Sequence, residues 1–236
     1  MLVLALDASS PVGSIALHDE SGSVGVFTVS VDLTHSEGLM PAVADLLRRA
    51  GKSVDDLTAL ACITGPGSYT GLRVGIASAQ GLALAKNLPC VGLSSLDVLS
   101  WALPMARFQL CPLLPARKGW LYARLYRWGN SSPQAATEEL YVQPDELASY
   151  IDEPTVFYGP GLAPYRRDLQ EMLEEQFIAV PDVFHLPRAD ILAELAVREL
   201  KKGGGVSLER LLPHYLGPSQ AEINWKRRQA SGARPS

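Results

Sequence analysis

One stretch decides the fold of this chain: ALACITGPGSYTGLRVGIASAQGLALAK, residues 59–86. The apolar run 59–64 predicts a buried strand, and the glycine- and proline-rich residues 65–69 predict a turn. Residues 70–86 then predict a long helix. Beyond the capping residue Thr70, only Arg73, Ser78 and Gln80 offer strong polar groups between residues 70 and 85. We expect a helix this apolar to be buried on nearly every side, with Arg73 and Gln80 marking one thin wet stripe.

Glycines inside this helix need a compensating contact. Gly71, Gly75 and Gly81 each cost about 1 kcal/mol relative to alanine. The usual compensation is close approach, because a glycine has no Cβ to hold a neighbouring backbone away. Gly71, Gly75, Ala79 and Ala83 recur at every fourth position and form one seam of small residues. Two interpretations stay open: the seam packs on the chain's own sheet, or part of it contacts another protein.

The same stretch does not fit the common nucleotide-binding loops. A Walker loop needs Gly-Lys-Ser/Thr, but Gly71 is followed by leucine and the next lysine is Lys86. The dinucleotide fingerprint fails as well, because Gly65, Gly67 and Gly71 are spaced one residue too widely.

Composition narrows the class of protein. The chain has 236 residues, of which 47% are hydrophobic and 19% charged, so it can bury a sizeable core. A formal net charge of −4 argues against a protein that holds nucleic acid by its global field. Cys62, Cys90 and Cys111 lie in apolar runs without metal-site spacing, as in reduced cytosolic proteins. We therefore expect a cytoplasmic protein that does not insert into a membrane.

The block from Gly65 to Gly75, continuing into residues 79–83, closely resembles the signature of the bacterial TsaB (YeaZ) family. The triplet His35-Ser36-Glu37 and the later run Pro213-His214-Tyr215-Leu216 also match that family's pattern. The resemblance implies an α/β protein with the two-lobed actin-like/sugar-kinase (ASKHA) fold. It implies a first, partner-binding lobe over residues 1–105 and a second lobe over residues 106–217. Residues 218–236 are then expected to form a flexible basic tail, either simply solvated or holding RNA weakly.

The function implied by the resemblance is that of a non-catalytic dimerisation subunit. Its TsaD-type partner transfers threonylcarbamoyl from an adenylate to the tRNA adenosine next to the anticodon, and a TsaE-type ATPase joins the assembly. The chain is expected to have no cofactor of its own, because ATP and threonylcarbamoyl adenylate are used by the assembled complex. It is expected to meet tRNA only through the complex, and to form a homodimer too. Whether homodimer and heterodimer share one surface stays open.

The resemblance places the partner interface on first-lobe helices that pack into an intermolecular bundle. Together with the small-residue seam, it predicts these interface residues: His35, Leu39, Val43, Leu46, Gly71, Leu72, Gly75, Ile76, Ser78 and Ala79.

A vestigial phosphate region is predicted at the first bend. Asp7, Ser9 and Ser10 follow an apolar strand and precede a second one, as in the phosphate region of the actin-like ATPases and sugar kinases. Asp7 could equally be a carboxylate that caps its own turn. The resemblance implies neither a catalytic residue nor a metal site in this chain. In the catalytic partner the corresponding region carries two histidines four residues apart, which hold a metal. Here Leu39 stands four residues beyond His35, so that pair is broken. Pro115 stands where the family normally has an aspartate in the second lobe.

Two other functions remain compatible with the sequence. The first is an active small-molecule kinase or ATPase of the same superfamily with Asp7 as its metal or base carboxylate. ATP turnover that is lost in Asp7→Asn would favour it. The second is a homodimeric regulatory binding protein, which mixing with the catalytic partner on a sizing column would distinguish.

Overall fold

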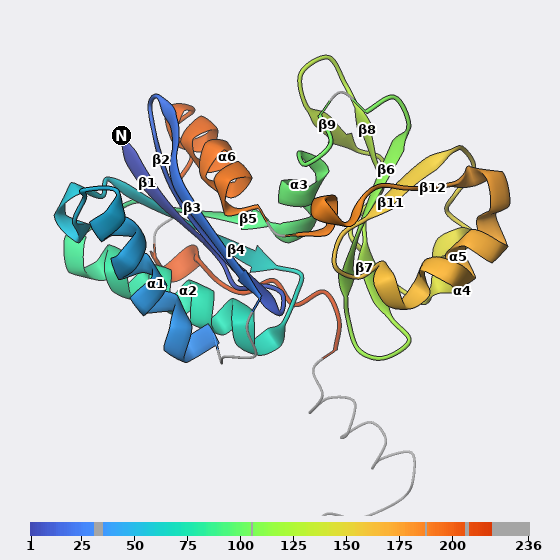
Figure 1. Ribbon diagram of the computed structural model, residues 1–236, viewed down its shortest axis with the longest axis horizontal. Coiled ribbons are helices and arrows are strands. Elements are labelled where there is room, and N and C mark those ends of the chain that lie inside the picture. Colours follow the sequence, from blue (N-terminus) through green and yellow to red (C-terminus); the bar gives the residue numbers. More distant parts are fainter. Residues whose placement is uncertain (31–34, 105, 187, 206–207, 219–236) are drawn as a thin grey trace, which may run out of the picture.

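The computed structural model describes residues 1–30, 35–104, 106–186, 188–205 and 208–218, with residues 29–30 and 35–37 described by their backbone alone. The chain forms two lobes that lie side by side, each built on its own sheet (Figure 1). The predicted two-lobed α/β architecture is confirmed.

The first lobe is organised around a five-stranded sheet in the order β3-β2-β1-β4-β5. Its strands are β1 (Leu2–Asp7), β2 (Val12–Asp19), β3 (Gly22–Ser30), β4 (Ala59–Gly65) and β5 (Cys90–Ser94). The first three run antiparallel, while β4 and β5 run parallel to β1. Because β1 is central and every one of its residues is buried, its sequence is a continuous apolar run rather than an alternating one.

Helices cover both faces of this sheet. Below it lie α1 (His35–Arg49) and α2 (Tyr69–Lys86), and above it lies α6 (Ala189–Lys201) (Figure 1). Leu4 of β1 packs in the core on the α1 and α2 side, while its neighbour Val3 packs with α6. This alternation follows from the period of two in a strand. A short 3-10 turn, η1 (Val54–Asp56), precedes β4.

The second lobe has a seven-stranded sheet that contains the path β10-β7-β6-β11-β12, with β8 beside β6 and β9 beside β8. Helix α3 (Ser95–Ser100) lies between the lobes, and α4 and α5 cover the outer side of the second lobe (Figure 1). The strands are β6 (Gln109–Pro115), β7 (Leu121–Ala123), β8 (Tyr126–Trp128), β9 (Pro133–Ala135), β10 (Leu140–Val142), β11 (Thr155–Tyr158) and β12 (Phe177–Ala179). The remaining helices are α4 (Pro144–Ala148), α5 (Arg166–Leu173) and the 3-10 turns η2 (Ala163–Tyr165), η3 (Glu174–Gln176), η4 (Asp182–His185) and η5 (Leu208–Arg210).

The end of the chain departs from the predicted division into lobes. Residues 106–217 were assigned to the second lobe, yet α6 packs on β1 and β2 of the first sheet. Residues 208–215 then run along α2, where Gln80 Nε2 donates to the carbonyl oxygens of Leu208 and Leu211, both at 3.1 Å. The amphipathic pattern of α6 indicates a helix but not which of the two sheets it covers. The predicted tail beyond residue 218 lies outside the described residues.

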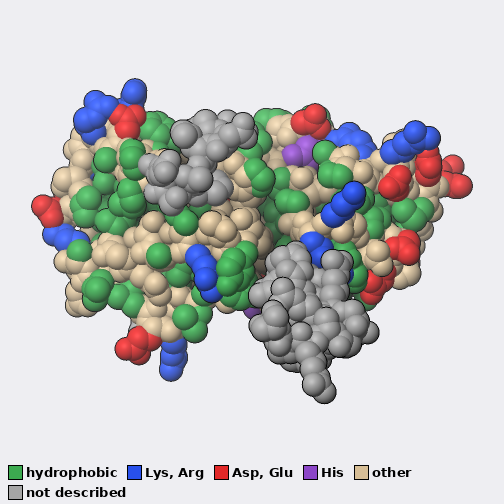
Figure 2. All heavy atoms as spheres, turned by 90° about the horizontal axis from the view of Figure 1, so that it is seen from below, with side chains coloured by type: hydrophobic (Ala, Val, Ile, Leu, Met, Phe, Trp, Pro, Cys, Tyr) green, Lys and Arg blue, Asp and Glu red, His purple; other side chains and the backbone are tan. Residues whose placement is uncertain are grey.

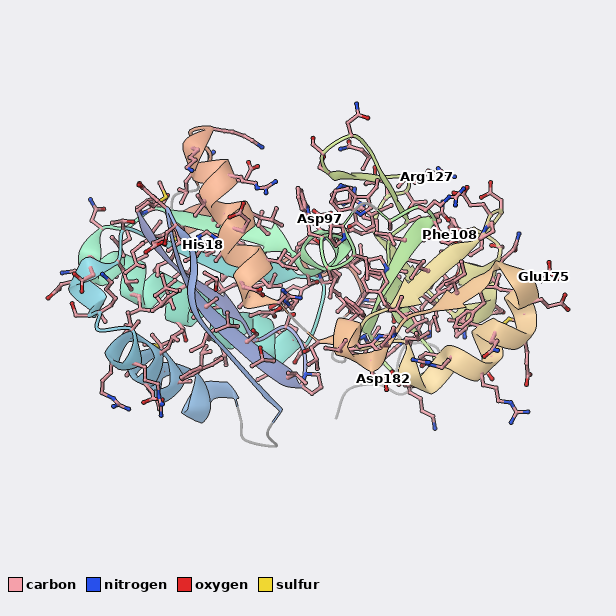
Figure 3. The ribbon with its side chains drawn as sticks, turned by 45° about the horizontal axis from the view of Figure 1, so that its top comes forward. His18, Asp97, Phe108, Arg127, Glu175 and Asp182 are labelled. Atoms are coloured by element: carbon pink, nitrogen blue, oxygen red, sulfur yellow. The ribbon has the colours of Figure 1, made fainter. Side chains whose placement is uncertain are left out.

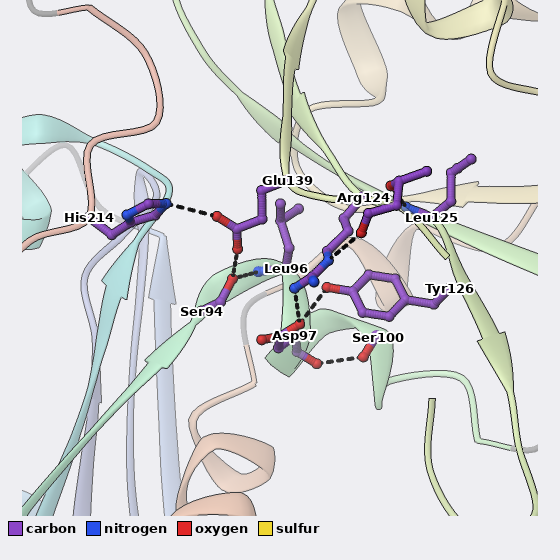
Figure 4. Close-up of polar contacts among 10 residues, drawn as sticks. Ser94, Leu96, Asp97, Ser100, Arg124, Leu125, Tyr126, Glu139 and His214 are labelled. Carbon is purple, nitrogen blue, oxygen red and sulfur yellow. Dashed lines mark hydrogen bonds and ion pairs between the residues drawn. The ribbon is translucent and has the colours of Figure 1, made fainter. Parts of the chain in front are cut away.

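Side-chain hydrogen bonds join the two lobes (Figure 4). Asp97 on α3 accepts from Tyr126 Oη at 2.7 Å and from Arg124 Nη1 at 3.1 Å. Glu139 accepts from Ser94 Oγ at 2.5 Å, and its other oxygen lies 3.1 Å from His214 Nε2. Asp97 occupies the central position between the lobes in Figure 3 as well. These hydrogen bonds and the ion pair hold the two lobes against each other.

No helix within the described ranges is long and apolar enough to cross a membrane.

Candidate functional site

The segment 59–86 folds as its sequence predicts, with one correction at the helix start. Strand β4 extends one residue further than expected, to Gly65, and α2 begins at Tyr69. Ser68, rather than Thr70, caps α2, because its Oγ accepts a hydrogen bond from Gly71 N at 3.2 Å. At the other end Asn87 adopts the left-handed conformation that stops a helix.

The predicted phosphate residues meet at the carboxyl end of β1. Asp7 is 3% exposed, and one of its oxygens accepts from Ser9 N at 2.9 Å and from Ser9 Oγ at 2.6 Å. Ser10 Oγ donates to the carbonyl oxygen of Val12 at 2.9 Å. These contacts are those of a carboxylate and a hydroxyl that hold their own turn.

The cavity beside Asp7 is very small. Residues of both lobes line it, among them Ser95, Leu114, Pro160 and Arg188, and its volume of about 10 Å³ is room for roughly one water molecule. Arg188, the cation at its edge, is held by both oxygens of Asp190, at 2.9 and 2.7 Å. The cavity that these described residues line is therefore far smaller than a nucleotide.

Among the described residues that line this cavity, those of the second lobe include no carboxylate to match Asp7. Strand β6 ends at Pro115, at the position where the resemblance leads one to expect an aspartate. In the part of the chain that the structure describes, no three His, Cys, Asp or Glu side chains converge as metal ligands. The side chain of His35, the one histidine of the motif, lies outside the described residues.

The cysteines are not arranged as nucleophiles. Cys62, Cys90 and Cys111 are free and at most 1% exposed. Burial raises the pKa of Cys62 to about 12 and that of Cys90 to about 11, and it raises the pKa of Cys111 as well. All three thiols are therefore protonated at neutral pH, the form that is a poor nucleophile.

A thiol titration tests this assignment. We expect a disulfide reagent such as DTNB to modify none of the three cysteines in the native chain at neutral pH and all three in denaturant. A fast stoichiometric reaction of one thiol in the native chain, with the melting temperature unchanged, would contradict it.

The small-residue seam of α2 packs inside the chain. A Cβ on Gly71 would overlap the carbonyl oxygen of Ala8, and a Cβ on Gly75 would lie 3.6 Å from Ala8 Cβ. Ala79 and Ala83 are fully buried in the core beneath the first sheet. The seam therefore allows α2 to approach the turn that follows β1, which is the first of the two interpretations left open by the sequence.

Most of the predicted interface residues are consequently unavailable for direct contact. Leu39, Val43 and Leu46 of α1 are 7%, 1% and 2% exposed and pack under the sheet. Of the α2 set, Ser78 alone is more than slightly exposed, since Gly71, Leu72, Gly75, Ile76 and Ala79 are buried. The sequence could not indicate which side of α2 packs inside the chain, because a helix that is apolar all round gives no orientation from sequence.

The opposite side of α2 is exposed, and it carries no charge. Positions 74, 77, 78, 81, 84 and 85 follow the helical spacing of one continuous face, hereafter the outer face of α2. Its residues are Val74, Ala77, Ser78, Gly81, Leu84 and Ala85. Leu84 is 76% exposed, the highest value among the large hydrophobic side chains described. On α1 the exposed residues Met40, Pro41 and Ala44 continue the apolar surface.

Figure 2 views the molecule from this side. Outside the grey atoms, hydrophobic side chains and uncharged tan atoms cover much of the lobe that contains α1 and α2, and most of its charged side chains lie toward the rim. Contiguous apolar surface of this kind marks an interaction site more often than a solvated face. One residue in the sequence pointed to this exposed face. Gly81 lies outside the small-residue seam, yet it costs the helix as much stability as Gly71, so it too needs an explanation.

Comparison with known proteins agrees with this geometry. The family model for tRNA N6-adenosine threonylcarbamoyltransferase (TsaD) matches residues 11–225. The structure of YeaZ from Pseudomonas aeruginosa superposes with a TM-score of 0.78 at 30% identity, covering 91% of this chain and 99% of that one. The chain belongs to the TsaB (YeaZ) family. The tRNA threonylcarbamoyladenosine biosynthesis protein TsaB of Bacillus subtilis is 29% identical over 228 residues, which is 95% of this chain and 98% of that protein. TsaB of Escherichia coli is also 29% identical, over 96% of this chain and 98% of its own length.

TsaB proteins are named for the biosynthesis of threonylcarbamoyladenosine in tRNA, so the chain belongs to a family involved in that modification. The resemblance read from residues 65–75 is confirmed.

Proposed function

We propose that this chain is a non-catalytic scaffold subunit that binds a TsaD-type threonylcarbamoyltransferase through the outer face of α2 and the adjoining surface of α1. In the proposed assembly the partner enzyme carries out the transfer to the tRNA adenosine next to the anticodon, and a TsaE-type ATPase joins. The assembly, and not this chain alone, uses ATP and threonylcarbamoyl adenylate.

One observation carries the proposal: Gly81 faces open space. A Cβ built on Gly81 meets no described atom within 4 Å apart from the adjoining backbone of α2 itself, although a glycine in mid-helix costs about 1 kcal/mol. No packing contact from another described part of the chain compensates for that cost. Beside it stands the exposed Leu84, with no charged side chain on the outer face of α2. A second helix packed closely over Gly81 would account for both features, because glycine permits close approach and the apolar face would then be buried.

The absence of catalysis by this chain is supported by the state of the cleft. Asp7 is bound to its own turn, the adjoining cavity admits about one water molecule, and β6 ends in Pro115. A kinase of this architecture needs room for a nucleotide between its lobes. The kinase alternative therefore has no observation in its favour among the described residues.

Reconstitution tests the proposed function. We expect the purified chain to co-elute on a sizing column with the TsaD-type enzyme of its own organism. We also expect it to be required, with the TsaE-type ATPase, for multiple-turnover formation of threonylcarbamoyladenosine on a tRNA transcript. Full activity of the partner enzyme without this chain would contradict the scaffold role. ATP turnover by the pure chain that is lost in Asp7→Asn would favour the kinase instead.

A further inference from the structure

Two clusters of an arginine with two aromatic rings lie where the C-terminal segment crosses between the lobes. In the first cluster, the Arg73 guanidinium carbon lies 4.2 Å from the ring centroid of Tyr69. Tyr69 in turn stacks on Tyr215 with the centroids 4.9 Å apart. Arg73 Nε donates to Tyr215 Oη at 2.9 Å. The guanidinium of Arg73 is therefore held both by the ring of Tyr69 and by the hydroxyl of Tyr215. Tyr69 and Tyr215 are still 45% and 42% exposed.

The second cluster belongs to the β6–β7 hairpin and β10. The Arg117 guanidinium carbon lies 4.6 Å from the ring centroid of Trp120. Trp120 stacks on Tyr141 with centroids 4.4 Å apart and an interplanar angle of 15°. The next residue of the turn, Lys118, is exposed.

The C-terminal segment makes these clusters one surface. His214 N donates to the carbonyl oxygen of Thr64 at 2.7 Å, which seats the segment beside the start of α2. Three residues later, a Cβ on Gly217 would lie 2.9 Å from Tyr141 Cε2, so the backbone of the segment lies directly against the second cluster. The segment thus runs from one cluster to the other without a gap. We call the whole the arginine–aromatic surface, made of Tyr69, Arg73, Arg117, Trp120, Tyr141, Tyr215 and Gly217.

Its two arginines differ from most others in the chain. Eight arginines form ion pairs with carboxylates: Arg48, Arg49, Arg124, Arg127, Arg166, Arg167, Arg188 and Arg198. Among the described residues, neither Arg73 nor Arg117 has a carboxylate within ion-pair distance. Each is instead held against a ring, which orders the guanidinium while leaving donors for an external acceptor. Phosphate oxygens suit such a planar donor, and exposed tyrosine rings suit unpaired bases.

The sequence that follows this segment is rich in basic residues. The residues after Pro218 include Lys226, Arg227, Arg228 and Arg234 against the single acid Glu222. The net formal charge of −4 for the whole chain therefore coexists with an excess of basic residues in the sequence after Pro218.

We propose that the arginine–aromatic surface binds RNA directly, with Arg73 and Arg117 on backbone phosphates. The identity of the RNA as tRNA rests on the proposed function, whereas the binding itself does not. This differs from the expectation that the chain meets tRNA only through its complex. The contact begins at Arg73, one helical turn before Ala77 of the outer face of α2, and extends from there to the second lobe. The RNA site and the proposed partner site therefore adjoin each other on one subunit.

Binding of a fluorescently labelled, unmodified tRNA transcript to the full chain tests the inference. We expect measurable binding at low salt that weakens steeply as salt rises. Arg73→Ala and Arg117→Ala should each weaken it roughly 3- to 10-fold and lower the slope of log affinity against log salt by about 1. Arg117→Lys should keep part of the affinity, because it retains the charge but not the planar donor.

Arg127→Ala is the matched control. Arg127 is also exposed, but it is paired with Glu153. It lies on β8, which is at the top of the second lobe in Figure 1, opposite the underside seen in Figure 2. We expect it to leave affinity and salt slope unchanged. Absence of tRNA binding by the parent chain at low salt would overturn the inference, as would full binding by both alanine variants. If those variants bind RNA normally but lose the TsaD-type enzyme, the surface is a protein contact and the RNA assignment is wrong. None of these outcomes depends on the outer face of α2, so the proposed function stands or falls separately.

Discussion

Gly71→Ala is expected to destabilise the chain more than any other single methyl group added to α2. The new Cβ would overlap the carbonyl oxygen of Ala8 and lie 3.1 Å from its carbonyl carbon. Both are backbone atoms of the turn after β1, so neither a rotamer change nor a small side-chain shift can relieve the overlap. Overpacking of this kind costs about 3 kcal/mol or more, of which the better helix propensity of alanine returns about 1 kcal/mol. The net loss of about 2 kcal/mol should lower the melting temperature by roughly 4–8 °C.

Gly81→Ala provides the control on the same helix. Because no described atom beyond the adjoining backbone of α2 lies within 4 Å of its built Cβ, the substitution gains helix propensity without overpacking. We expect the unfolding free energy to rise by about 1 kcal/mol and the melting temperature by roughly 2–4 °C. Thermal melts of the parent chain and both variants, measured in dilute solution, check the pair. Equal melting temperatures for Gly71→Ala and the parent would mean that the seam is not internal.

The contrast between these two glycines shows which features of α2 could be predicted from the sequence and which could not. The strand, turn and helix over residues 59–86 follow from apolar runs and from glycine and proline, which are local signals. That Gly71 and Gly81 each need an explanation follows from helix propensity. Which glycine meets the chain's own backbone depends on the rotation of the helix about its axis, and an apolar face on every side leaves that rotation undetermined.

Long-range contacts account for the other differences. Arg73 and Gln80 were expected to mark a wet stripe on α2, yet Gln80 donates to carbonyl groups of residues 208 and 211 and Arg73 donates to Tyr215. Those partners lie more than a hundred residues away in the sequence. The two polar residues correctly indicated that this side of α2 does not face the hydrophobic core. That it is the chain's own C-terminal segment could not be inferred from the pattern, just as the return of α6 to the first sheet could not.

The closed cleft of the phosphate region has a similar explanation. The sequence placed Asp7, Ser9 and Ser10 together at one bend, and the structure brings them together there. Both a phosphate ligand and a turn-capping carboxylate fit that pattern. The choice depends on the second lobe, where Leu114 and Pro160 fill the space opposite Asp7.

Leu84→Asp is the substitution for which we expect the largest loss of partner binding. Leu84 is 76% exposed in the free chain, so a carboxylate there is solvated and the melting temperature should change little. In the proposed complex the same position is covered by a helix of the partner. The variant would then lose about 1.5–3 kcal/mol of apolar burial and would also bury an unpaired charge. Together these effects should cost about 3 kcal/mol or more, which is roughly a 100-fold loss of affinity or greater.

Val183→Asp is the matched control, because Val183 is 65% exposed on η4 of the second lobe, away from the outer face of α2. Affinity for the TsaD-type enzyme, measured by calorimetry or surface plasmon resonance, should be unchanged in this variant and lost in Leu84→Asp. Self-association measured by ultracentrifugation on the same preparations then addresses the homodimer. Loss of both associations in Leu84→Asp would mean that homodimer and heterodimer share the outer face of α2, because a single exposed side chain can weaken both only if both cover it. Retention of partner affinity with an unchanged melting temperature would show that the partner binds elsewhere, and that Gly81 and Leu84 are exposed for another reason.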